Sequence, residues 1–354
     1  MKNNKSVYIA PVSFLNDKNG QSLFKQGLAR RLGEKKYFCE IKIYNRDSGY
    51  SYTMPVSQFE KKYLQKHMRL SSMYQNIISK KKLFVKNVDI LKKNDYLIFG
   101  ILNITPDSFS DGGKFNSANS GFAKANHMYN EGANFIDVGG ESTRPGARKV
   151  PANQELIRVL PVLQKLCEKK IPISLDTRNS STMHFSNFYD VAIINDVSAL
   201  RDRESVNFLK SSKLPVILMH MPGNPKTMMN KKYKDVILDT YDFLEKRIKF
   251  CVKNGIQKNK IVIDPGIGFG KNKEQNIQLI KNISIFHSLG CAIMLGVSRK
   301  KIISSFGKKN LANERVGGSI SIALNCFTKG VEIFRVHDVK ETIQAIEAWK
   351  SIDN

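Results

Sequence analysis

Residues 101–113 read ILNITPDSFSDGG, an apolar run that stops at Asn103 and continues as a polar loop. With Ile98 and Phe99 before it, the run is typical of a strand covered on both faces. The loop combines carboxylates, hydroxyls and a Gly112-Gly113 pair. Such hard oxygen ligands suit Mg²⁺. An ordinary exposed turn has the same composition, so the clusters further along the chain decide between the two interpretations.

The composition is that of a globular chain of 354 residues, 41% of them hydrophobic. No apolar run approaches the ~20 residues of a membrane-spanning helix. The N-terminus has too short an apolar core for a signal peptide. We therefore expect a cytoplasmic protein that does not bind membranes. Its five cysteines are far apart and form no CxxC pair, which argues against a disulfide framework or a zinc site.

The formal net charge of +26 raises the question of a nucleic-acid partner. Lysine supplies most of this charge and is scattered along the whole chain, often among asparagines. Arginine-rich or aromatic-interleaved patches are not evident. We therefore interpret the charge as a solvated surface that attracts anionic substrates, and expect no nucleic-acid partner.

The first 95 residues differ from the rest and are predicted to form a small α+β extension. Alternating apolar residues in 37–43 and 50–54 flank a turn at 45–49, which predicts a hairpin. Ser57 is placed to cap a helix that continues to Ile77. Such a small unit can hardly bury an apolar stripe alone. We therefore expect it to dock on the bottom or the outer helices of the following domain, and assign it no catalytic role.

Residues 96–354 repeat a short apolar run, a polar loop and an amphipathic stretch. The predicted strands are 98–103, 135–138, 171–175, 191–195, 216–219, 261–264, 293–296 and 333–336, with helices at 118–131, 154–167, 236–252, 314–327 and 339–349. About eight such units in roughly 260 residues predict a (β/α)8 TIM barrel. A doubly wound sheet is the alternative, but no glycine-rich dinucleotide fingerprint follows any strand.

Polar clusters follow these strands, and in a barrel the carboxyl ends of the strands surround one mouth. The clusters are Asp137 with GGESTRPG at 139–146, DTR at 176–178, Asn195-Asp196, MHM at 219–221, DPGIGFGK at 264–271, GVSRKK at 296–301 and RVHD at 335–338. Any one of them is explained by capping or a turn. Their convergence favours an active site.

In this order the motifs NITPDSFSDGG, GGESTRPGA, DPGIGFGK, SRK and RVHD resemble those of the dihydropteroate synthase family, over roughly residues 97–351. The resemblance implies a magnesium-dependent barrel enzyme, commonly a homodimer, that serves folate biosynthesis. Its substrates are 4-aminobenzoate and 6-hydroxymethyl-7,8-dihydropterin diphosphate, and its products are 7,8-dihydropteroate and pyrophosphate. It also implies a target for sulfonamides, which imitate 4-aminobenzoate.

The resemblance also implies residue roles. The pterin site would comprise Asp137, Asp176, Asn195, Met219, Asp264 and Lys300. Asn103, Arg144, Arg335 and His337 would form the pocket for the diphosphate, with Mg²⁺ on Asn103 and Asp111. The 4-aminobenzoate site would comprise Phe109, Thr143, Pro145 and Phe269, with the carboxylate near Lys301 and the helix that starts there. Lys301 occupies a position that is often serine in the family.

Two other functions fit parts of the chain. A pterin-binding methyltransferase domain shares the barrel and the pterin contacts, but has no use for the ESTRPG, SRK and RVHD clusters. A non-enzymatic basic barrel that binds nucleic acid is the second alternative, and retention on heparin well above physiological salt would favour it.

Overall fold

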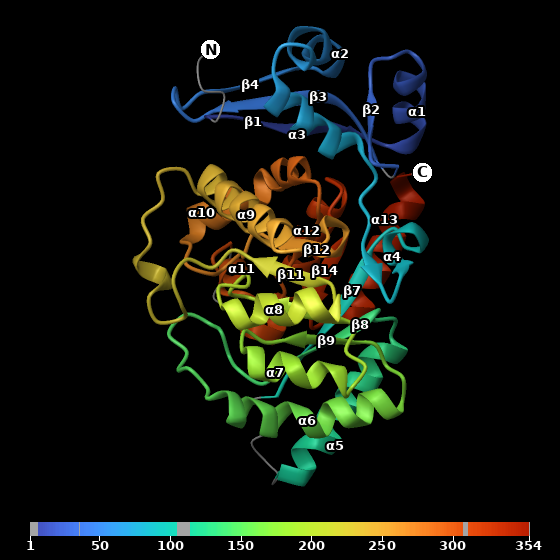
Figure 1. The fold of residues 1–354 in the computed structure, drawn as a ribbon. Coiled ribbons are helices and arrows are strands. Elements are labelled where there is room, and N and C mark those ends of the chain that lie inside the picture. Colours follow the sequence, from blue (N-terminus) through green and yellow to red (C-terminus); the bar gives the residue numbers. More distant parts are fainter. Residues whose placement is uncertain (1–5, 35, 105–113, 307–310, 354) are drawn as a thin grey trace.

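The computed structural model describes residues 6–34, 36–104, 114–306 and 311–353. Within these ranges, eight parallel strands close into a barrel in the order β10-β11-β12-β13-β14-β7-β8-β9. They are β7 (Leu97–Asn103), β8 (Phe135–Gly139), β9 (Ile173–Asp176), β10 (Ile193–Asp196), β11 (Val216–Met219), β12 (Ile261–Asp264), β13 (Ala292–Leu295) and β14 (Ile333–Val336). The last strand pairs with the first, which confirms the predicted (β/α)8 barrel (Figure 1).

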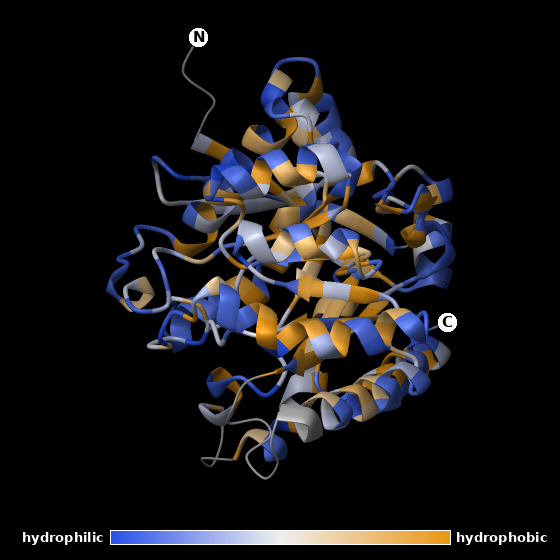
Figure 2. Ribbon diagram, turned by 60° about the horizontal axis from the view of Figure 1, so that its bottom comes forward, coloured by the Kyte–Doolittle hydropathy of each residue, from blue (hydrophilic) through white to orange (hydrophobic). Residues whose placement is uncertain are grey.

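Helices connect these strands and cover the outside of the barrel. They are α5 (Lys114–Asn130), α6 (Ala152–Glu168), α7 (Ser180–His184), α8 (Arg203–Ser212), α9 (Val236–Lys253), α10 (Lys273–Lys281), α11 (Lys301–Ser304), α12 (Val316–Phe327) and α13 (Val339–Asp353). Their hydrophobic residues recur every three or four positions, as on α6, where Val159, Val162 and Leu166 are buried. Figure 2 shows this mixture of hydrophobic and hydrophilic residues along the helices.

A separate antiparallel sheet precedes the barrel. It contains β1 (Val7–Leu15), β2 (Arg30–Leu32), β3 (Lys36–Asn45) and β4 (Ser51–Pro55), and α1 (Asp17–Lys25) connects β1 to β2. The central strand is β3, which pairs with each of the other three. The predicted hairpin corresponds to β3 and β4 and is confirmed. The sequence analysis did not predict β1, whose apolar run is interrupted by Pro11.

The helix predicted from Ser57 to Ile77 is wrong as a single element. The chain forms α2 (Val56–Phe59), a π-helical turn (Glu60–Leu64) and α3 (Met68–Ile78), and Ser57 lies inside α2 rather than at its cap. The break lets the chain fold back on itself, so that the ring of Phe59 lies 5.7 Å from that of Tyr74. Tertiary packing therefore overrides the helical period in this segment.

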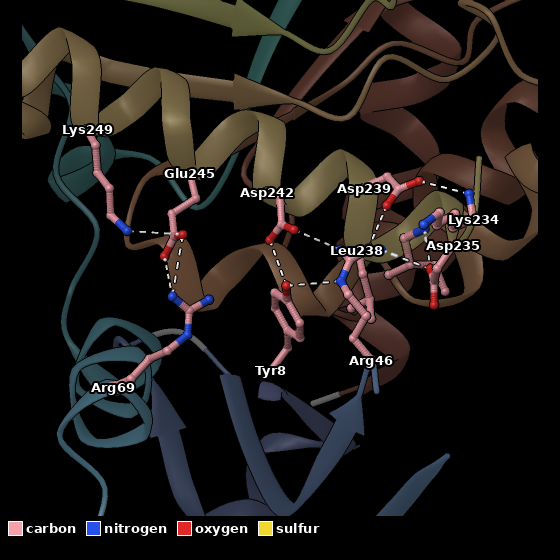
Figure 3. Close-up of polar contacts among 11 residues, drawn as sticks. Tyr8, Arg46, Arg69, Lys234, Asp235, Leu238, Asp239, Asp242, Glu245 and Lys249 are labelled. Carbon is pink, nitrogen blue, oxygen red and sulfur yellow. Dashed lines mark hydrogen bonds and ion pairs between the residues drawn. The ribbon is translucent and has the colours of Figure 1, made fainter. Parts of the chain in front are cut away.

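The extension docks on an acidic face of α9 (Figure 3). Residues three positions apart lie on one face of a helix, and on α9 these are Asp239, Asp242 and Glu245. The contacts are Arg46 Nη1 to Asp239 Oδ1 at 2.7 Å, Arg46 Nη2 to Asp242 Oδ2 at 2.8 Å, Tyr8 Oη to Asp242 Oδ1 at 2.8 Å and Arg69 Nη1 to Glu245 Oε1 at 3.2 Å. This placement confirms that the extension docks on the outer helices.

A 3₁₀ helix, η7 (Ile283–Leu289), forms the second part of this interface. Asn76 on α3 donates to the carbonyl oxygen of Ser288 at 2.9 Å. A Cβ atom at Gly290 would lie 2.5 Å from Asn76 Oδ1, and Gly290 has a φ of +78°. Only glycine allows this approach without strain. The close fit makes the extension part of the same hydrophobic core as the outer helices.

The segment between the extension and β7 closes the bottom of the barrel. It forms β5 (Phe84–Val85), β6 (Val88–Asp89) and α4 (Ile90–Lys93). Leu83, Val85 and Leu91 are buried against the side chains that fill the inside of the barrel, among them Leu97 and Phe99.

The described residues contain no helix that is long and apolar enough to span a membrane.

Candidate active site

A layer of inward-facing side chains lies at the carboxyl ends of the barrel strands. Phe135, Ile193, Ile217, Val262 and Ile333 belong to the core inside the barrel. Because side chains alternate along a strand, the residue two positions later points to the same interior. These residues are Asp137, Asn195, Met219, Asp264 and Arg335. The barrel therefore brings most of the predicted pterin site to one mouth.

Two carboxylates at this mouth share one guanidinium. Arg335 donates from Nε to Asp137 Oδ2 at 2.5 Å and from Nη2 to Asp176 Oδ2 at 2.7 Å. Asp137 also accepts from Ser174 Oγ at 2.6 Å and from Asn195 Nδ2 at 3.1 Å. Burial raises the pKa of Asp176 above its usual range, although the Arg335 guanidinium acts in the opposite direction. The network holds each of these groups in a fixed orientation.

Asp264 and Lys300 lie next to this network. Asp264 Oδ1 accepts the backbone N–H of Gly266 at 2.7 Å, and the Lys300 amine donates to the carbonyl oxygen of Ile267. A Cβ atom at Gly296 would lie 3.7 Å from Asp264 Oδ2, 3.8 Å from Lys300 Nζ and 4.0 Å from Arg335 Cβ. Gly296 thus leaves open the space on which these three side chains converge.

Burial dominates the electrostatics of Asp264 and Lys300. It lowers the pKa of Lys300 to about 8, and it raises the pKa of Asp264. The opposite charges of the two groups offset part of each shift. A ligand with paired donors and acceptors would satisfy both groups at this depth.

His337 is a neutral imidazole surrounded by cations. Burial lowers its pKa to about 3, and the neighbouring charges that add to this shift are Arg335, Arg299, Lys124 and Arg144. Ser298 Oγ accepts the backbone N–H of His337 at 3.1 Å and lies 3.0 Å from His337 Nδ1. We assign the hydroxyl proton to the bond with Nδ1, which leaves the ring proton on Nε2. His337 is then a neutral donor within a positive pocket.

The loop after β8 carries Thr143, Arg144 and Pro145. Arg144 and Pro145 are exposed and Thr143 is half-buried. The loop is tied to the one after β11, because Gly146 donates its N–H to the carbonyl oxygen of Pro225 at 2.8 Å. The positive charge of Arg144 contributes to the lowered pKa of His337.

An apolar cluster forms one wall of the mouth. Met219 is buried with Val197, Met221 and Met228, and Phe269 packs against them. Lys300 Nζ lies 4.6 Å from the centre of the Phe269 ring, a cation–π distance. Lys301 begins the four-residue helix α11 and is exposed.

Phe109 and Asp111 lie outside the described residues. Asn103, the other predicted metal ligand, ends β7 and is half-buried. In the part of the chain that the structure describes, no group of three or more His, Cys, Asp or Glu side chains is arranged to hold a metal ion.

Several residues of this site were not singled out by the sequence analysis. Ser174 and Ser298 orient Asp137 and His337, and Lys124 and Arg299 add positive charge. Arg299 is itself held by Asp338, to which its Nε donates at 3.0 Å. The SRK and RVHD motifs contain three of these residues and were the available signal. Lys124 is one of many lysines, and its sequence context gives no signal.

Comparisons with a family model, with related sequences and with solved structures all identify the same family. Residues 99–337 match the pterin binding enzyme family. The dihydropteroate synthase of Escherichia coli K12 is 41% identical over 267 residues, which are 75% of this chain and 94% of that protein. The structure of Xanthomonas albilineans dihydropteroate synthase with 4-aminobenzoic acid has a TM-score of 0.69 and 38% identity, covering 73% of this chain and 93% of that one. A Yersinia pestis dihydropteroate synthase in complex with a sulfonamide drug has a TM-score of 0.71 and 38% identity, covering 76% of this chain and 99% of that one. The chain belongs to the dihydropteroate synthase family of pterin-binding enzymes.

Proposed function

We propose that this chain condenses 4-aminobenzoate with 6-hydroxymethyl-7,8-dihydropterin diphosphate to give 7,8-dihydropteroate and pyrophosphate. The observation that carries the proposal is the convergence of Asp264, Lys300 and Arg335 on the space beside Gly296. Buried groups of both signs at this depth suit the alternating donors and acceptors of a pterin edge, and they reject a ligand that leaves them unpaired.

In this proposal the pterin ring binds over the network of Asp137, Asp176 and Asn195. Asp264 accepts from the amino group and a ring nitrogen, and Lys300 donates to the ring oxygen and nitrogen. Met219 packs against the ring, as its place in the apolar wall allows. The fixed hydrogen bonds of the network mean that little reorganisation accompanies binding.

The diphosphate would lie against the positive pocket around His337. The bond from the exocyclic carbon to oxygen breaks as negative charge grows on the leaving group, which Arg144, Arg335 and the Nε2–H of His337 stabilise. Because His337 is neutral, it donates a hydrogen bond to the leaving group without adding a further positive charge beside these cations. Lys124 and Arg299 add to the field at this pocket.

The arylamine then attacks the exocyclic carbon, so no protein nucleophile is required. The proposed 4-aminobenzoate site uses Thr143, Pro145, Phe269 and Phe109. Lys301, which is exposed, would attract the carboxylate in this proposal. Catalysis would then come from positioning the two substrates and from stabilising the leaving group.

We propose Mg²⁺ as the cofactor, held by Asn103 and Asp111. The amide oxygen of Asn103 at the end of β7 is a ligand type that Mg²⁺ accepts, and Mg²⁺ keeps several waters or phosphate oxygens in its shell. The ion would supply further charge neutralisation at the diphosphate.

The experiment that tests this function is turnover of 4-aminobenzoate and the pterin diphosphate, with and without Mg²⁺, followed by pyrophosphate release. Heat-treated protein and the variant Asp264→Asn are the controls. Absence of pyrophosphate release from a folded protein that binds pterin would favour the methyltransferase alternative. Absence of both turnover and pterin binding would reject both enzymatic interpretations.

We also propose a homodimer that uses the outer face of α12. In a chain with 25% charged residues, the twelve residues VGGSISIALNCF of α12 include no charge. Gly317, Ser321 and Asn325 on this helix are exposed, and a Cβ atom at Gly317 would meet nothing within 4 Å. Charged residues are depleted at the centres of protein–protein interfaces, which is the feature of α12 that supports the proposal. Ser321→Arg should therefore yield monomers by light scattering, whereas Asn207→Arg on the exposed side of α8 should not.

A further inference from the structure

We propose that Lys271 is a positioning residue, whose amine fixes the loop between β12 and α10 so that Asp264, Phe269 and Met219 face the substrates. The inference rests on the proposed function. Lys271 is the last residue of the DPGIGFGK motif, and the mechanism above assigns it no role. Lys271 is buried, and its amine hydrogen-bonds to the backbone of its own loop and to His220.

The Lys271 amine hydrogen-bonds to three of the described residues through acceptors that are not carboxylates, although the nearby charge of Asp264 raises the pKa of Lys271 against the effect of burial. Nζ lies 2.8 Å from the carbonyl oxygen of Gly266, 3.0 Å from that of Phe269 and 2.9 Å from His220 Nδ1. A lysine that served only to neutralise charge would contact an acidic group, because a buried ammonium needs compensation. This amine instead contacts the imidazole of His220 and three carbonyl oxygens, those of Gly266 and Phe269 closely and that of His220 at 3.5 Å.

The residues that Lys271 contacts either belong to the proposed site or lie next to one of its residues. Gly266 accepts from Lys271 through its carbonyl oxygen and donates its N–H to Asp264 Oδ1 at 2.7 Å. Phe269 is held through its own carbonyl oxygen. His220 follows Met219 at the end of β11. One amine therefore couples the pterin carboxylate, the aromatic wall and the apolar wall.

The backbone of the loop explains why a long donor is needed. Gly266, Gly268 and Gly270 have φ values of +69°, +83° and +62°. A Cβ atom at Gly266 would lie 2.0 Å from the carbonyl oxygen of His220. These turns direct carbonyl groups inward, where each needs a donor because a buried unpaired carbonyl is costly. Lys271 reaches into this space and provides the donors.

The hydrogen bonds of Lys271 can form whether the proton between Lys271 and His220 lies on the amine or on the imidazole. As an ammonium, Lys271 donates three protons, and His220 Nδ1 is one of the acceptors. As an amine, it donates two protons to the carbonyl oxygens and accepts one from His220 Nδ1. Burial lowers the pKa of Lys271 and that of His220 well below their ordinary values. The geometry of the loop is therefore insensitive to which of the two groups carries the proton.

The test compares Lys271→Met with Lys81→Met in the full-length chain. Lys81 is a matched control, because its amine also donates to backbone carbonyl oxygens, those of Asn76 and Ser79, but does so where the extension meets the barrel. Methionine keeps the length of the side chain and removes the donors. Melting temperature, Kd for a phosphate-free pterin and the steady-state constants for both substrates are measured for each variant.

We expect Lys271→Met to lower kcat/KM by about 10- to 100-fold, with a higher KM for 4-aminobenzoate and weaker pterin binding, as for a misplacement of reacting groups by about 1 Å. Lys81→Met should keep kcat/KM and the Kd for the pterin unchanged. Its melting temperature should fall by about as much as that of Lys271→Met. His220→Leu, which removes one of the three contacts, should have an intermediate effect and serves if Lys271→Met does not fold.

The inference is overturned if folded Lys271→Met keeps kcat/KM and the pterin Kd within twofold of the unsubstituted chain. It is also overturned if Lys81→Met loses activity to the same extent, because the effect would then be general destabilisation. A lack of turnover in the unsubstituted chain would count against the proposed function instead, and the pterin Kd would still test the role of Lys271.

Discussion

Arg335 on β14 reaches Asp176 on β9 across two intervening strands, with 2.7 Å between Nη2 and Oδ2. The same guanidinium holds Asp137 through Nε. The sequence analysis assigned Arg335, together with its neighbour His337, to the diphosphate pocket. Arg335 therefore links the carboxylates of the proposed pterin site to the cations of the proposed leaving-group site.

This link predicts different effects for two substitutions in the RVHD motif. Arg335→Ala leaves two buried carboxylates without their cation, so we expect it to lower the free energy of unfolding by about 3–5 kcal/mol. It should also weaken binding of a phosphate-free pterin. His337→Ala should slow turnover of the diphosphate and leave both the stability and this binding nearly unchanged. Urea denaturation and calorimetry measure these quantities, and equal effects of the two variants on phosphate-free binding would contradict the assignment.

Asp264→Asn is expected to weaken pterin binding. The amide presents one donor where the carboxylate offers only acceptors, so one buried donor of the pterin lacks its partner, at a cost of roughly 1–3 kcal/mol. Calorimetry with a phosphate-free pterin measures the change. Asp190→Asn, at an exposed carboxylate paired with Lys86, is the control. Unchanged affinity in Asp264→Asn would mean that the pterin binds elsewhere.

The lowered pKa of Lys300 predicts a pH dependence with a definite sign. As the pH rises through about 8, folded Lys300 loses its proton, and we expect the affinity for pterin to fall. An unfolded lysine keeps its proton until about pH 10.4. Between these values the unfolded state binds more protons, so the contribution of Lys300 to stability increases with pH.

Pterin affinity measured from pH 6 to 9 tests this prediction. Lys300→Arg provides the comparison, since arginine stays charged throughout this range. We expect the fall near pH 8 to be absent in this variant. A fall of the same size and midpoint in both proteins would assign the titration to another group.

Removal of the extension should affect stability more than catalysis. A chain that begins at Leu83 keeps the residues that close the bottom of the barrel but exposes α9 and η7, where Tyr241 and Phe286 are fully buried. We expect measurable turnover with a lower melting temperature, or a loss of solubility or of the dimer. A truncated chain with an unchanged melting temperature and no turnover would instead give the extension a part in the active site.

The ion pairs of this interface should contribute little individually. Arg46, Asp239 and Asp242 keep 27%, 23% and 46% of their side-chain surface exposed. Partly exposed pairs contribute roughly 0.2–1 kcal/mol. Arg46→Ala should therefore cost less than about 1 kcal/mol in urea denaturation. A much larger loss would mean that charge, rather than apolar packing, holds the extension in place.

Sulfonamides should inhibit turnover by competing with 4-aminobenzoate. The compounds imitate the arylamine, and the proposed site for that substrate includes Phe269 and the exposed Lys301. Inhibition should decrease as 4-aminobenzoate is raised, and Lys301→Ala should raise the KM for 4-aminobenzoate. Inhibition that is independent of 4-aminobenzoate would place the sulfonamide outside this site.

The sequence alone determined the barrel and the composition of its mouth. Short, mostly apolar runs followed by polar residues occur eight times, and each predicted strand agrees with the observed one to within two residues at either end. This prediction succeeds because burial on both faces of a parallel strand favours a near-continuous apolar run, whereas its carboxyl end is free to be polar. The motifs at these ends were sufficient to identify the family.

Only the tertiary structure decided how these residues are partnered. The pairing of Arg335 with Asp137 and Asp176 joins residues 198 and 159 positions apart, and Lys271 contacts His220, which is 51 positions away. The break between α2 and α3 was likewise missed, because the contact of Phe59 with Tyr74 outweighs the local helical period. Local sequence patterns indicate which face of a helix or strand is buried. The partner of a buried polar group, however, depends on which elements the closed barrel brings together.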